Sequence, residues 1–128
     1  MKWFLPLCFV GTCLLAPAGR ADETPGAAKL WVFVGTYTNA KSKGIYRLEL
    51  DPATGKLTDL QLAAQTPSPS FLAIHPNGQN LYAVGETAGK NGGTVSAFAV
   101  DRKTGTLKFL NHQSSIGAGP CHINVDKS

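Results

Sequence analysis

IYRLELDPATGKL at residues 45–57 returns fifty residues later as VSAFAVDRKTGTL at residues 95–107. The Asp, Thr, Gly and final Leu of the motif fall on identical offsets in the two copies. A second block agrees at an offset of 51, where PSFLAIH at 69–75 matches PCHINVD at 120–126. Two matching blocks in the same order indicate an internal repeat of about fifty residues, a period typical of repeat architectures.

Each copy of the repeat consists of short strands separated by turn signals. In the second copy, PNG at 76–78 separates the first two strands and KTG at 103–105 separates the last two. The expected strands are 71–75, 80–86, 94–101 and 107–114 in that copy, and 30–38, 44–50 and 57–64 before it. Four-stranded units at this spacing are typical of propeller blades, whereas a sandwich would not repeat both turn chemistry and strand order. We therefore expect an all-β fold, a β-propeller fragment of about two blades.

The strand order predicts that the chain is the N-terminal part of a larger ring. With strands named A to D from the axis outward, residues 30–38 match a B strand, so the first blade lacks its A strand. Residues 126–128 align with 75–77, in the middle of a hairpin turn. We expect strands B to D of one blade, all of the next and one inner strand of a third, in a protein about three times longer. Incomplete blades expose apolar faces, so the isolated chain is not expected to fold stably.

Residues 1–21 have the three segments of a secretory signal peptide. A Lys-containing start precedes an uncharged apolar run at 3–16, and small residues follow. The run of about 14 residues is shorter than the roughly 20 that a membrane-spanning helix needs, which disfavours a membrane anchor. Cleavage after Ala21 or Ala18 would release the propeller segment 22–128 to the periplasm or the medium, with no membrane association.

Charge and cysteine content argue against a nucleic-acid-binding protein and against a fold stabilised by disulfide bonds. The formal net charge of +4 falls to +2 once Lys2 and Arg20 are removed, and no basic stripe points to nucleic acid. Removal of Cys8 and Cys13 leaves Cys121 alone, so no internal disulfide can form. Cys121 is expected to be a buried apolar side chain, with an intermolecular partner or a reactive thiol as alternatives. We expect a monomer.

Several blocks resemble one known family. VGTYT at 34–38 followed by SKGIY at 42–46 is similar to the opening of the lactonase family of seven-bladed β-propellers. PSFLAIHPNGQNLYAV at 69–84 resembles the first inner hairpin of that family, and GPCHI at 119–123 resembles the start of its next blade. The resemblance implies a seven-bladed ring and a small-molecule lactone as substrate. It also implies hydrolysis of a sugar lactone, as in the propeller-type 6-phosphogluconolactonases.

Candidate catalytic residues follow from the polarity of the strands. Loops from D to A and from B to C open on one face of a propeller, where binding sites normally lie at the mouth of the channel. His122 begins an inner strand there and could activate water or stabilise an oxyanion, or could merely cap the strand. Glu86 ends a B strand on the same face and could act as a base, bind sugar hydroxyls or anchor the glycine-rich loop 89–93. Tyr37 occupies the matching place in the preceding blade and is a candidate substrate-binding residue.

Other polar residues are weaker candidates. Lys43 and Lys90 lie on loops of the same face, where they could meet a substrate phosphate or remain solvated. His75 is expected in a turn and His112 on an outer strand. The loop 89–93 lacks the Lys-Ser/Thr ending of a phosphate-binding P-loop, and no Cys, His, Asp and Glu occur at metal-binding spacing, so no metal and no cofactor are expected.

Three interpretations of function remain open at this stage. A sugar lactonase is favoured, and export favours an unphosphorylated lactone over a 6-phosphate. An exported, non-catalytic propeller used for binding or scaffolding is the main alternative, because propellers host many functions. The third is a lactone-forming cycloisomerase, which needs no hydrolytic water.

Overall fold

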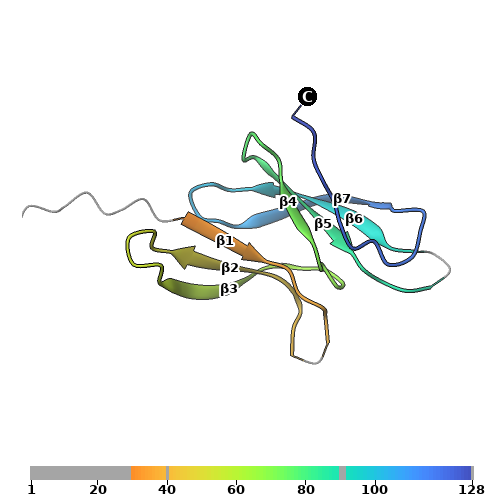
Figure 1. Ribbon diagram of the computed structural model, residues 1–128, viewed down its shortest axis with the longest axis horizontal. Coiled ribbons are helices and arrows are strands. Elements are labelled where there is room, and N and C mark those ends of the chain that lie inside the picture. The colour runs from red at the N-terminus through yellow and green to blue at the C-terminus, as the bar shows by residue number, and fades with distance from the viewer. Residues whose placement is uncertain (1–29, 40, 90–91, 128) are drawn as a thin grey trace, which may run out of the picture.

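Seven strands in two antiparallel sheets make up the described part of the chain. The computed structural model describes residues 30–39, 41–89 and 92–127 (Figure 1). The first sheet contains β1 (Leu30–Val34), β2 (Gly44–Leu50) and β3 (Leu57–Gln65), and the second contains β4 (Leu72–Ile74), β5 (Asn80–Gly85), β6 (Thr94–Val100) and β7 (Leu107–Ser114). Within these residues no helix is long and apolar enough to cross a membrane. The predicted signal peptide lies outside the described residues.

The strands confirm the predicted blade order. The sheet β4-β5-β6-β7 is one complete blade from A to D, and the sheet β1-β2-β3 is a blade with strands B to D. The largest difference is at β1, which ends at Val34 and not at residue 38, whereas the other strand ends differ by at most one residue. Beyond β1 the Thr36 hydroxyl donates a hydrogen bond of 2.7 Å to the Gly44 carbonyl oxygen. The inner strand predicted at 120–126 is wrong. These residues are irregular, since no strand within the described residues pairs with them.

The repeated turns have the same hydrogen bonds in both blades. The carboxylate of Asp51 accepts a hydrogen bond of 2.9 Å from the backbone nitrogen two residues later, and that of Asp101 accepts one of 2.8 Å. The fifth residue of each turn, Gly55 or Gly105, has a φ of 70° or 67°. Glycine adopts this left-handed conformation without a steric penalty, so the repeated Asp and Gly set the turn.

The two blades pack face to face through an apolar core. Ile45 of β2 meets Leu81 and Ala83 of β5 and Phe98 of β6, all at most 1% exposed. These residues point to the same side of their strands because side chains alternate between the two faces of a sheet. Removing their apolar surface from water, at about 25 cal/mol per Å², holds the blades together.

A polar cluster fastens the outer turn of the second blade to the first blade. Arg47, only 8% exposed, forms an ion pair of 2.6 Å with Asp59 and donates a hydrogen bond to the Thr104 carbonyl oxygen. Its guanidinium lies over the Trp31 ring, 4.3 Å from the centroid. The Trp31 indole donates a 3.1 Å hydrogen bond to the Arg102 carbonyl oxygen. We call these five residues the inter-blade clasp.

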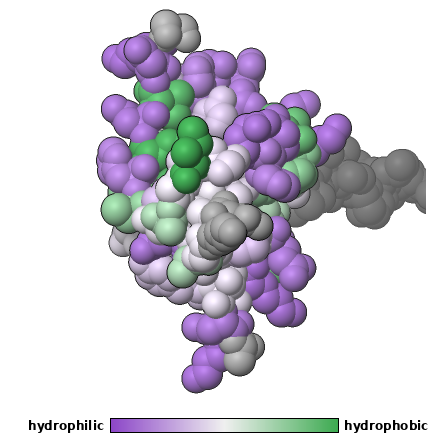
Figure 2. Space-filling view, turned by 90° about the vertical axis from the view of Figure 1, so that its right-hand side faces the viewer, coloured by the Kyte–Doolittle hydropathy of each residue, from purple (hydrophilic) through white to green (hydrophobic). Residues whose placement is uncertain are grey.

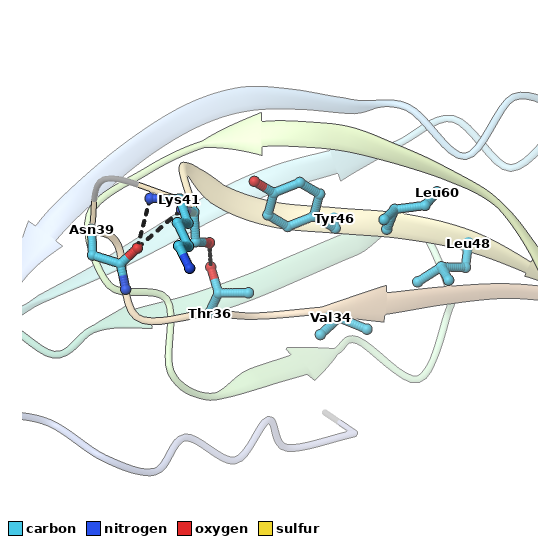
Figure 3. Close-up of a pocket in the computed structure, with 8 residues that line it drawn as sticks. Val34, Thr36, Asn39, Lys41, Tyr46, Leu48 and Leu60 are labelled. Atoms are coloured by element: carbon cyan, nitrogen blue, oxygen red, sulfur yellow. Dashed lines mark hydrogen bonds between the residues drawn. The ribbon is translucent and has the colours of Figure 1, made fainter.

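The outer face of the first blade is apolar and uncovered. Val34, Tyr46, Leu48 and Leu60 line a hollow of about 430 Å³ on this face, which continues to polar residues of the loop after β1 (Figure 3). Leu60 is 66% exposed, although it lies within a strand. Large aliphatic side chains along a sheet face normally pack against another layer, so this face is suited to burial.

Candidate functional site

The loops that follow β1, β3, β5 and β7 lie at the same end of the two blades, and in Figure 1 they extend from the lower centre, after β1, to the right, after β5 and β7. We call this the loop end. Figure 2 looks onto it and shows hydrophilic residues around its margin, with a hydrophobic group above its centre. The loop end carries Tyr37, Glu86 and His122, three residues that the sequence analysis selected.

The structure brings Tyr37 and Glu86 into direct contact. The Tyr37 hydroxyl donates a hydrogen bond of 2.9 Å to Glu86 Oε2, joining the loop after β1 to the residue after β5. The two residues are 49 positions apart and belong to different blades. Their side chains can meet because the apolar core holds the two sheets side by side.

Ser70 is a further member of this cluster. Its hydroxyl oxygen is buried and makes no hydrogen bond of standard geometry, but it lies close enough to Glu86 and Tyr37 to influence both pKa values. The Ser70 hydroxyl, followed by that of Tyr37, lowers the pKa of the Glu86 carboxyl group. The hydrogen bond to Glu86 and its negative charge raise the pKa of Tyr37 above 10.0. At neutral pH the cluster therefore holds an anionic Glu86 and a neutral Tyr37.

Sequence reasoning did not select Ser70. The available signal was its place in the second repeated block, where Ser70 aligns with Cys121, the neighbour of His122. That alignment places Ser70 in a loop between blades but does not show which side chains it faces. The contact with Glu86 depends on the packing of two loops.

Backbone contacts hold the loop that carries Ser70. The Glu86 amide donates a 2.9 Å hydrogen bond to the Ser68 carbonyl oxygen, and the Ser68 amide donates one of 3.1 Å to the Thr38 hydroxyl. A side chain at Gly35 would overlap the Pro69 carbonyl oxygen, so only glycine allows this close approach. The loop is thus held between the ends of two strands from different blades.

His122 lies at the loop end and is exposed. Within the described residues its contact is with Phe71, whose ring centroid is 4.6 Å away at an interplanar angle of 51°. Cys121, the preceding residue, lies close enough to Tyr37 to contribute to its raised pKa. The prediction that Cys121 is buried is wrong, because the irregular segment that carries it leaves the free thiol exposed.

The other candidates lie away from this cluster. Lys43 is exposed and lines a separate groove of about 350 Å³ between the loop after β1 and the end of β3. Lys90 lies outside the described residues. His75 accepts a 3.2 Å hydrogen bond from the Asn77 amide, which confirms its place in a turn, and His112 is exposed on the outermost strand. Within residues 30–39, 41–89 and 92–127, no three His, Cys, Asp or Glu residues gather as a metal site would require.

Comparison with known proteins establishes the family. A family model described as "Lactonase, 7-bladed beta-propeller" matches residues 31–128. The chain belongs to this family. Among curated relatives of this lactonase-family chain, the 6-phosphogluconolactonase of Bacillus subtilis strain 168 is 42% identical over 94 residues, which are 73% of the chain and 26% of the relative. The resemblance stated from the sequence is confirmed.

Solved structures agree with the propeller fold. A Bacteroides fragilis crystal structure, provisionally assigned as a 6-phosphogluconolactonase, matches 83% of the chain with a TM-score of 0.74 and 37% identity, over 29% of its own length. The periplasmic gluconolactonase of Pseudomonas aeruginosa matches 72% of the chain with a TM-score of 0.65 and 27% identity, over 26% of its length. The lactonase-family chain therefore spans about a quarter of the length of these relatives.

Proposed function

We propose that the full-length protein is a carboxylic ester hydrolase that opens a sugar lactone, in the manner of a 6-phosphogluconolactonase. The observation that carries this proposal is the 42% identity to a protein of that name, within the lactonase family. The hydrogen-bonded Tyr37 and Glu86 at the loop end support it, because a polyhydroxyl substrate needs fixed polar partners.

The proposed reaction needs a base, an oxyanion donor and groups that bind sugar hydroxyls. Water adds to the lactone carbonyl, the ring ester bond breaks, the ring oxygen takes a proton and a sugar acid is released. Glu86 is suited to binding sugar hydroxyl groups, because its lowered pKa keeps the carboxylate ionised as a hydrogen-bond acceptor and makes it a weak base. The exposed imidazole of His122 is the proposed base or oxyanion donor, and Tyr37 contacts the substrate beside Glu86.

We further propose that residues 1–21 direct export, that residues 22–128 form the start of the mature propeller, and that the substrate is an unphosphorylated lactone. The similarity to a periplasmic gluconolactonase supports export. The charge of the cluster favours an unphosphorylated lactone as the substrate. Glu86 adds a negative charge to the cluster, whereas a phosphate group would need a positive one. Lys43 lines a different groove, and its role in phosphate binding would require a second site.

The test is an assay of the full-length protein with gluconolactone and with its 6-phosphate, corrected for spontaneous hydrolysis. We expect turnover, with the unphosphorylated lactone preferred. His122→Ala should lower kcat/KM by about 100-fold, the usual minimum for loss of a general acid–base group. His75→Ala, in the turn between β4 and β5 and away from the loop end, is the matched control and should leave kcat/KM unchanged. Absence of turnover with both lactones would contradict the proposal and favour a binding or scaffolding propeller.

A further inference from the structure

A second hollow lies between the two blades, on the outer side of the loop that carries Ser70. It has a volume of about 360 Å³, within the range of small-molecule sites. Six residues supply its polar and aromatic walls: Gln65 and Thr66 at the end of β3, Thr94 and Ser96 of β6, and Phe109 and His112 of β7. One wall comes from the end of β3 and the residues just after it, and the other comes from β6 and β7. Because β3 contacts β7 directly, the hollow is formed within the described part of the chain.

The hollow forms where the side chains on one face of β6 become smaller and more polar towards the loop end. Phe98 is 1% exposed in the core between the blades, and Ser96 and Thr94 follow it on the same face towards the loop end. Their side chains are smaller than that of Phe98, and both line the hollow. A gap therefore opens where the apolar core stops.

The internal repeat shows that this polarity is particular to the second blade. Ser96 lies opposite His112 in the register of β6 and β7. The residues fifty positions earlier, Tyr46 and Leu62, lie opposite each other in β2 and β3. The first blade thus has a large apolar pair where the second has a hydroxyl and an imidazole. Ser96 is only 5% exposed, and a polar group at a sheet interface is unfavourable unless it has a partner.

The lining of the hollow indicates the chemistry of that partner. Phe109 offers an apolar ring that is 54% exposed and is held by an edge-on contact with Phe98, with 5.7 Å between the ring centroids. Hydroxyl, amide and imidazole groups surround it, whereas none of the lining residues is Asp, Glu, Lys or Arg. An aromatic platform ringed by neutral donors and acceptors suits a ligand with an apolar face and several hydroxyl groups.

We propose that this hollow binds a neutral sugar ring, at a site separate from Tyr37 and Glu86. The ring would stack on Phe109, and its hydroxyl groups would hydrogen-bond Ser96 and His112. Such a site would hold a saccharide beside the loop end without taking part in hydrolysis.

The test measures binding of methyl glycosides of glucose, galactose and xylose to the full-length protein by saturation-transfer NMR. These probes have no lactone to hydrolyse, so the result is independent of the proposed activity. We expect binding by the wild type and at least tenfold weaker binding by the double variant Ser96→Tyr with His112→Leu. This variant gives the second blade the same residue pair that Tyr46 and Leu62 form in the first blade, and its larger Tyr side chain fills the hollow. Lactone hydrolysis and thermal stability should not decrease.

Gln113→Ala is the matched control, because Gln113 is exposed and points to the other face of β7 beside His112. Its affinity for the glycosides should equal that of the wild type. If the double variant fails to fold by circular dichroism, His112→Ala decides the test, since His112 is exposed and its loss removes one hydrogen-bonding group. Lack of glycoside binding by the wild type, or unchanged affinity in the folded variants, would overturn the proposal.

Discussion

Glu86 and Tyr37 shift each other's pKa in opposite directions. The folded state favours the ionised form of Glu86, so its stabilising interaction is present above its ordinary pKa of 4.5 and is lost as the pH falls through the lowered value. The folded state favours the neutral form of Tyr37, so its contribution is present below 10.0 and is lost as the pH rises through the raised value. The hydrogen bond between the blades is therefore intact across the neutral range.

Tyr37→Phe should raise the pKa of Glu86 towards its ordinary value, because one of the two hydroxyl groups that favour the carboxylate is lost. Carbon-13 NMR titration of the Glu86 carboxyl group in the full-length protein measures this shift directly. If Glu86 binds substrate as an anion, the acid limb of the kcat/KM profile should move to higher pH with it. Tyr82→Phe, in β5 away from the cluster, is the control. An unchanged Glu86 titration would contradict the hydrogen bond.

At the scale of the elements, two kinds of contact join the blades. The apolar core around Ile45 and Phe98 holds the blades together without fixing their relative orientation. The hydrogen bonds and ion pair of the inter-blade clasp are directional and fix that orientation. Arg47 contacts its own sheet, the Trp31 ring and the turn of the next blade at once. A planar guanidinium can make these contacts together, and a lysine cannot.

Arg47→Met should lower the free energy of unfolding by about 1–3 kcal/mol, since it keeps the length of the side chain but removes its charged hydrogen bonds and leaves Asp59 without this partner. Arg47→Lys should recover little of this loss. Urea denaturation of the full-length protein is the measurement. Arg102→Met, in the neighbouring turn, removes an exposed side chain while its carbonyl still accepts from Trp31, and should change stability by less than about 0.5 kcal/mol. A change of less than about 0.5 kcal/mol in the Arg47→Met variant would contradict a stabilising role of the clasp.

At the scale of the whole molecule, the two blades cannot cover their own apolar surface. The outer face of β1 to β3 exposes aliphatic side chains around a hollow of about 430 Å³, while the core between the blades contains four fully buried hydrophobic residues. Repeat units of this kind gain stability from their neighbours. The lactonase family is built as a seven-bladed ring, in which each face meets another blade.

The isolated segment 22–128 should therefore show no cooperative unfolding transition, and the full-length protein should show one. Differential scanning calorimetry of both proteins, at the same pH and concentration, is the measurement. Binding of a hydrophobic dye by the segment is expected as well, because its outer face is exposed. A sharp transition from the segment alone would mean that two blades form an independent folding unit.

The repeat alone predicted the strands, their order and the turns, since these features depend on residues close together in the chain. Asp51 and Gly55 form a turn through hydrogen bonds that span five residues, and alternation of apolar side chains marks each strand. The same local signals failed for Cys121 and the strand expected around it. A strand is stable only when another strand pairs with it, and none within the described residues does.

The sequence by itself thus determined the blade architecture and the family, and it selected Tyr37, Glu86 and His122 by their places at strand ends. The tertiary structure alone decided which side chains meet: Tyr37 with Glu86, and Arg47 with the turn at Thr104. These pairs are 49 and 57 residues apart. Their contacts depend on the angle and spacing of two packed sheets, which no short stretch of sequence specifies.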